Sequence, residues 1–133
     1  MTQQQLAHET RLERVLGVPL AASAVRQWPQ SAEQVDGRER IAEVESHFEG
    51  LRLAVGRRHR TGNVVVVEWT TDYGDGRLYR NVSVAELENG EAVRVTDYWG
   101  EPFDRPEWRG GLTEPLPMPR GGTWPSADEL YDE

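Results

Sequence analysis

Asp97 is the side chain of this sequence best suited to proton transfer. It alternates with apolar residues that occupy the same face of an extended strand, namely Val93, Val95 and Trp99. If that face is the inner one, Asp97 is a carboxylate among apolar neighbours, and such burial suits a carboxyl group to general acid–base catalysis. The alternative is an aspartate at the end of a strand that faces water or pairs with Arg94 or Arg80.

Glu68 is the second candidate catalytic carboxylate. It follows Val64 and Val66 on one face of its strand, but the other face is apolar as well, which indicates a central strand. Glu68 therefore either lines a pocket or is exposed at the end of the strand.

Three further side chains are candidates for binding a substrate. Trp28 is either a pocket wall or an ordinary core tryptophan. Asn81 either points into the pocket as an orienting group or forms a hydrogen bond near a turn. Tyr73 lies beside a glycine-rich turn and suits packing at a pocket rim better than proton donation.

Three consecutive strands position these residues, over 64–73, 79–87 and 92–99. Gly74-Asp75-Gly76 separates the first two strands, and Asn89-Gly90 separates the last two, a pair typical of a type I′ hairpin turn. Upstream, the patterns predict a helix over 3–15 with a capping-box pair at Thr2 and Gln5, a strand over 23–28, a helix over 36–50 and a strand over 51–59. This order predicts an α+β fold with the helices packed on one face of an antiparallel sheet.

Composition excludes several classes of protein. The chain of 133 residues fits one domain, and it has no cysteine and no lysine, which excludes thiolate and Schiff-base nucleophiles. Its net charge of −8 argues against nucleic acid and anionic membranes as partners. It contains no apolar run long enough to span a membrane and no signal-peptide pattern, so we expect a cytoplasmic location. His8, His47 and His59 lack ligand spacing and no nucleotide-binding motif is present, so neither metal nor cofactor is expected.

Residues 111–133 differ in composition from residues 1–110. They are rich in proline and glycine, which excludes a long helix or a central strand. Their aromatic side chains, Trp124 and Tyr131, are too apolar for a free linker. We therefore expect one domain over 1–110 and a tail over 111–133 that packs on the domain or on a partner subunit.

Five segments carry a family resemblance through their order and spacing: residues 25–31, 36–41, the hairpin at 89–90, residues 97–99 and residues 101–109. Together they resemble the nuclear transport factor 2-like superfamily, and within it the SnoaL-like and ketosteroid-isomerase-like branch. The resemblance implies a cone-shaped, curved antiparallel sheet wrapped around N-terminal helices. It also implies an apolar pocket at the open end of the cone and a homodimer.

The same resemblance bears on the chemistry of particular positions. Ketosteroid isomerases have a carboxylate base before the proline that ends the first strand, where this sequence has Trp28, and a second acid at the position of Ser83. Both differences argue against steroid isomerisation. The similar polyketide cyclases use an acid near the end of the last strand, to which Asp97 is nearest. The pair Tyr98-Trp99 matches the family, and Trp99 and Ser83 join Trp28, Tyr73 and Asn81 as the predicted substrate-binding residues.

Two functions follow from these patterns. The first is a pocket for a small apolar ligand, with cofactor-independent isomerase, cyclase or dehydratase activity on an apolar carbonyl compound and Asp97 and Glu68 as catalytic residues. The second is a non-catalytic ligand-binding or dimeric assembly module. The direction in which the two carboxylates point distinguishes the two functions.

Overall fold

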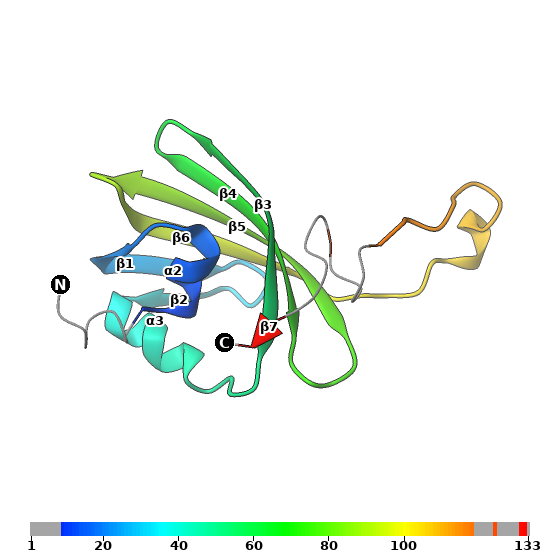
Figure 1. The fold of residues 1–133 in the computed structure, drawn as a ribbon, viewed down its shortest axis with the longest axis horizontal. Coiled ribbons are helices and arrows are strands. Elements are labelled where there is room, and N and C mark those ends of the chain that lie inside the picture. The colour runs from blue at the N-terminus through cyan, green and yellow to red at the C-terminus, as the bar shows by residue number, and fades with distance from the viewer. Residues whose placement is uncertain (1–8, 119–123, 125–130, 133) are drawn as a thin grey trace.

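This computed structural model describes residues 9–118, 124 and 131–132. Within them, one curved sheet forms the body of the fold and both helices lie on its concave side (Figure 1). The helices are α2 (Arg11–Leu16) and α3 (Arg38–Glu45), and a short 3-10 helix, η1, spans Glu107–Arg109. The strands are β1 (Leu20–Trp28), β2 (Glu33–Asp36), β3 (Arg52–Thr61), β4 (Val64–Asp72), β5 (Leu78–Glu88), β6 (Glu91–Gly100) and β7 (Tyr131–Asp132).

The strands lie in the order β2-β1-β6-β5-β4-β3-β7. The four strands from β3 to β6 form the expected antiparallel meander, and β1 joins it alongside β6 in the parallel direction. The predicted α+β cone is therefore confirmed, but its sheet is mixed. β2 was not predicted, because its four residues are polar apart from Val35 and lack an apolar alternation.

The turns of the meander follow the sequence closely. Asn89 and Gly90 have φ angles of 52° and 81°, and two positive values in succession are what a type I′ turn requires. The antiparallel register that this turn sets places Asp97 of β6 beside Ser83 of β5.

The first helix begins later than the sequence suggested. Glu9 and Thr10 are not helical, and the capping box is formed by Thr10 and Glu13: the Thr10 hydroxyl accepts from the Glu13 N–H, and the Glu13 carboxylate accepts from the Thr10 N–H. The pair Thr2 and Gln5 lies outside the described residues. Gly17, at φ 78°, ends the helix as expected.

The core lies between α2, α3 and the inner face of the sheet. Its buried side chains come from both helices and from alternate positions of the strands, for example Leu12, Ile41, Val67 and Val95. The same alternation brings polar residues of β1, β5 and β6 to the inner face, where Arg26, Asn81, Ser83 and Asp97 are buried.

Gly100, at the end of β6, provides a test of the packing between β5 and β6. A Cβ atom at this position would lie 2.5 Å from the carbonyl oxygen of Arg80, which belongs to the backbone and cannot move aside without distorting the strand. We expect Gly100→Ala to lower the free energy of unfolding by about 1–3 kcal/mol, the usual cost of overpacking. Gly111→Ala is the control, because nothing lies within 4 Å of the added carbon there. Equal urea midpoints for the two variants would contradict the described pairing.

Candidate functional site

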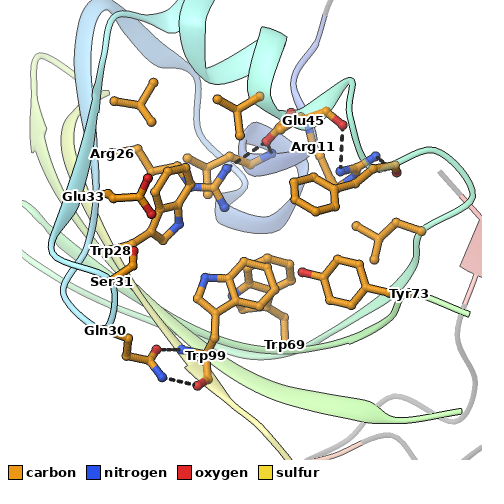
Figure 2. A pocket seen from close by; sticks show the side chains of 15 residues that line it. Arg11, Arg26, Trp28, Gln30, Ser31, Glu33, Glu45, Trp69, Tyr73 and Trp99 are labelled. Carbon is orange, nitrogen blue, oxygen red and sulfur yellow. Dashed lines mark hydrogen bonds and ion pairs between the residues drawn. The ribbon is translucent and has the colours of Figure 1, made fainter. Parts of the chain in front are cut away.

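A cavity of about 560 Å³ opens on the concave side of the sheet (Figure 2). This volume is in the range of pockets that hold small organic molecules. Five aromatic side chains line it, from Trp28, Phe48, Trp69, Tyr73 and Trp99. Trp69 and Trp99 meet edge to face with their ring centroids 5.2 Å apart, so these two walls support each other.

Arg26 places a buried cation in this aromatic cavity. Its side chain is only 5% exposed, and β1 carries it on the inner face beside Trp28. Nε donates to Oδ2 of Asp97 at 2.6 Å, and Nη1 donates to Oε2 of Glu45 at 3.2 Å. Nη2 has no hydrogen-bond partner in the described part of the chain, and the guanidinium points into the cavity in Figure 2.

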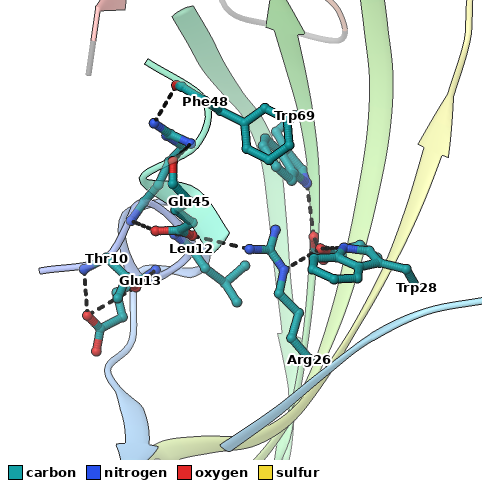
Figure 3. Close-up of polar contacts among 11 residues, drawn as sticks. Thr10, Leu12, Glu13, Arg26, Trp28, Glu45, Phe48 and Trp69 are labelled. Atoms are coloured by element: carbon teal, nitrogen blue, oxygen red, sulfur yellow. Dashed lines mark hydrogen bonds and ion pairs between the residues drawn. The ribbon is translucent and has the colours of Figure 1, made fainter. Parts of the chain in front are cut away.

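Glu45 is the carboxylate that lines the cavity next to Arg26. It is the last residue of α3 and reaches the start of α2, where Oε1 accepts from the Arg11 N–H at 2.8 Å and Oε2 accepts from the Leu12 N–H at 2.9 Å (Figure 3). Burial raises the pKa of Glu45, although Arg26 and the two backbone donors act in the opposite direction. Glu45 is thus a buried acid at the cavity wall that favours protonation more than an ordinary glutamate does.

Asp97 lies behind the wall and does not line the cavity. It is fully buried, and three donors surround its carboxylate: Ser83 Oγ donates to Oδ1 at 2.6 Å, and Trp28 Nε1 and Arg26 Nε donate to Oδ2. Trp69 Nε1 in turn donates to Ser83 Oγ at 2.9 Å. One carboxylate therefore orients the cavity cation and, directly or through Ser83, two of the tryptophan walls.

The predicted binding residues divide into two groups. Trp28, Tyr73 and Trp99 line the cavity, and burial raises the pKa of Tyr73 to about 12, so that its hydroxyl stays neutral. Ser83 and Asn81 are buried in the sheet and do not line the cavity. Asn81 donates to Thr71 Oγ1 at 3.1 Å.

Glu68, predicted as a second catalytic carboxylate, lies outside the cavity. Its strand has apolar side chains on both faces, and Val67 and Trp69 take the inner one. Glu68 therefore points outward, where both of its carboxylate oxygens accept from Arg57 at 2.6 and 3.0 Å. Neither carboxylate reaches the cavity, so this geometry does not support the acid–base role predicted for Asp97 and Glu68.

Arg26 and Glu45 are site residues that the sequence reasoning missed. Arg26 has the strand parity of Ala24 and Trp28, so an inward direction could have been predicted from Trp28. Glu45 follows the buried Ile41 by four residues and therefore shares its helix face. Both signals are present in the sequence, but charged residues are usually assigned to the surface.

Residues 9–118 with 124 and 131–132 contain no group of three or more histidine, aspartate or glutamate side chains placed to hold a metal ion. Neither described helix has the length and apolar character needed to cross a bilayer.

Comparison with known proteins identifies similar structures. The chain is 30% identical to an NTF2-like protein of unknown function from Burkholderia xenovorans LB400, with a TM-score of 0.65 over 74% of this chain and 77% of that one. It is 29% identical to a candidate ketosteroid isomerase from Kribbella flavida DSM 17836, with a TM-score of 0.66 over 74% and 73% of the two chains.

A third similar structure shares the fold alone. It is a protein with a ketosteroid isomerase-like fold from Catenulispora acidiphila DSM 44928, in complex with trimethylamine, at 16% identity and a TM-score of 0.53 over 75% of this chain and 88% of that one. No protein-family model and no curated protein sequence matches the chain.

Proposed function

This chain belongs to the nuclear transport factor 2-like superfamily, in its SnoaL-like and ketosteroid-isomerase-like branch, and on that premise we propose that its cavity binds a flat, largely apolar small molecule that carries an oxygen acceptor. Arg26 carries the proposal. It is a buried cation in a cavity lined mainly by apolar side chains, and its Nη2 group is directed inward without a partner in the described part of the chain.

The cavity walls define the shape of the ligand. The rings of Trp28, Trp69 and Trp99 offer faces and edges on which a planar apolar molecule can stack. A charged donor in such surroundings forms a strong hydrogen bond with a carbonyl, enolate or carboxylate oxygen, because little water competes for it. The ligand is therefore recognised by stacking over most of its area and by one polar contact at Arg26.

A catalytic role is the second candidate, and Glu45 favours it. A carboxyl group with a raised pKa lies beside the polarising guanidinium, which is the combination needed to move a proton next to a carbonyl group. This arrangement would support an isomerase, cyclase or dehydratase without a cofactor, with Glu45 in the role first predicted for Asp97. A non-catalytic carrier would use the same cavity without turnover.

The predicted homodimer, the cytoplasmic location and the packing of the tail stay predictions. Residues 101–118, which follow β6, expose large apolar side chains, including Phe103, Trp108 and Leu112. Such a surface is typical of a segment that packs on a partner subunit.

We expect 9-fluorenone to bind at least about tenfold more tightly than fluorene, which has the same rings but no carbonyl oxygen. Binding is measured by quenching of tryptophan fluorescence in a Trp108→Phe background, which removes the emission of an exposed tryptophan far from the cavity. Trp99→Ala should weaken both compounds alike, because it removes a stacking wall but leaves Arg26. Equal affinities for fluorenone and fluorene would contradict the role of Arg26, and failure of both to bind would contradict the pocket.

A further inference from the structure

We propose that the cavity takes up its ligand as an anion together with one proton, the anionic group binding to Arg26 and the proton binding to Glu45. The inference rests on the proposed function, since it assumes that the cavity is a ligand site. It goes beyond that function by naming the charge of the ligand and the residue that compensates for it.

The charges that Arg26 contacts directly favour such compensation. One guanidinium is shared between two carboxylates, Asp97 at 2.6 Å and Glu45 at 3.2 Å, so the three side chains together carry one net negative charge when both acids are ionised. An anion bound to Nη2 adds a second negative charge to a buried group that water screens weakly. Protonation of one carboxylate removes one negative charge, so that Arg26 can bind the anion effectively.

Glu45 is the carboxylate that can accept this proton. Its side chain is 11% exposed and lines the cavity, whereas Asp97 is fully buried behind the wall and bonded to three side-chain donors. Burial already raises the pKa of Glu45 in the empty cavity. A bound anion next to it raises that pKa further, because two like charges disfavour each other.

Other charged groups near Glu45 also act on its pKa, and Arg11 lowers it. Arg11 on α2 donates to the backbone oxygens of Glu45 and Phe48, not to the Glu45 carboxylate that would take the proton. The burial of Tyr73 keeps its hydroxyl neutral up to about pH 12. Among the described residues, the charged or titratable groups that line the cavity with Glu45 or act on it are Arg11, Arg26, Glu33, Arg38 and Tyr73, and Asp97 lies on the other side of Arg26.

The direction of the pH effect follows from these charges. Ionised Glu45 opposes an anion at Arg26 and protonated Glu45 does not. The affinity for an anion must therefore fall as the pH rises through the pKa of Glu45, by up to about tenfold per pH unit when one proton is taken up. A neutral ligand of the same shape has no such dependence.

Two probes with the same aromatic framework test the inference. The anionic probe is 8-anilinonaphthalene-1-sulfonate, and the neutral one is N-phenyl-1-naphthylamine; neither titrates between pH 5.5 and 8.5. We expect the dissociation constant of the sulfonate to rise with pH while that of the neutral amine changes less than about twofold. Calorimetry in phosphate and in Tris buffer measures the proton uptake directly, and competition between the probes shows that they share one site.

Variants of α3 assign the proton. Glu45→Gln should abolish both the proton uptake and the pH dependence of sulfonate binding, while the amine still binds. Glu43→Gln is the matched control, because Glu43 lies on the same helix but is exposed outside the cavity, and it should retain both. If Glu45→Gln does not fold, the proton uptake of the natural chain still decides whether a proton binds together with the anion.

The outcomes separate the inference from the proposed function. If the amine binds but the sulfonate binds without a proton or not at all, the inference is wrong and the pocket stands. Loss of the pH dependence in Glu43→Gln would also overturn it. If neither probe binds, the proposed function fails and the inference fails with it.

Discussion

Replacing Arg26 with methionine is expected to lower the free energy of unfolding at pH 7.5 by about 3–5 kcal/mol, the usual range for removing one partner of a buried ion pair. Arg26 is the shared cation of two buried carboxylates, and methionine fills much of its volume without providing a charge or a donor. Asp97 then loses its ion-pair partner, and Glu45 loses the stronger of its two neighbouring cations. Urea unfolding of the variant and of the natural chain measures the loss.

The stability that Arg26→Met loses should become smaller as the pH is lowered. Without Arg26, burial acts on Glu45 unopposed by that cation, so the pKa of Glu45 in the folded variant lies further above its unfolded value. Because this folded-state pKa is above the unfolded one, the cost of burying ionised Glu45 is absent at pH values below the unfolded pKa. The cost is complete at pH values above the folded pKa. Arg57→Met is the control, since it removes an exposed partner of Glu68 and should leave the urea midpoint close to that of the natural chain. If Arg26→Met is as stable as Arg57→Met at pH 7.5, the buried network is not formed.

The parts of the fold that the sequence predicted are those with local signals. Asn89-Gly90 and Gly74 to Gly76 mark turns through residues that accept positive φ angles, and apolar alternation defines the strands on either side. β2 has no such signal. It forms because the turn after Trp28 returns the chain alongside β1, where Trp28 pairs with Glu33.

The candidate site was harder to predict because its contacts join distant parts of the chain. Arg26 is 19 residues from Glu45 and 71 residues from Asp97, and no local pattern specifies either pair. The aromatic walls Trp28, Tyr73 and Trp99 could be predicted because large aromatic side chains gain most from burial and the strand pattern placed them near strand ends. The direction of Glu68 could not be predicted, because both faces of β4 are apolar. Only the placement of the helices decides which face is the inner one.

Asp97→Asn is expected to lower the free energy of unfolding by about 3 kcal/mol while leaving proton uptake on anion binding in place. The amide removes the charge that Arg26 pairs with, and its NH₂ group replaces one of two oxygens that both accept hydrogen bonds, so it faces either Ser83 or Arg26 and Trp28 as a donor against a donor. Trp28 and Arg26 also lose the shared anionic acceptor that orients them. Glu68→Gln is the control, because it removes only an outer ion pair.

The pH profile distinguishes a positioning role of Asp97 from a catalytic or proton-accepting one. Loss of one negative charge near Arg26 and Glu45 lowers the pKa of Glu45, so the decline in sulfonate affinity should move to lower pH in Asp97→Asn. If Asp97 itself accepted the proton, the variant would instead lose the pH dependence and the proton uptake. Stability alone would not separate these roles, because the asparagine destabilises the fold in both.

The double variant Arg26→Met/Asp97→Asn tests whether the two residues act as a pair. Arg26→Met leaves Asp97 as a buried charge without a cation, and Asp97→Asn leaves Arg26 with Glu45 as its one remaining carboxylate, whereas the double change removes both charges and leaves Glu45, which can be protonated and keeps its backbone donors. We therefore expect the double variant to be more stable than the sum of the single losses predicts, by about 1–3 kcal/mol. Urea unfolding of all four proteins at pH 7.5 gives this coupling energy. Additive losses would mean that Arg26 and Asp97 contribute independently, and Asp97 could then no longer be regarded as the anchor that holds the cavity cation in place.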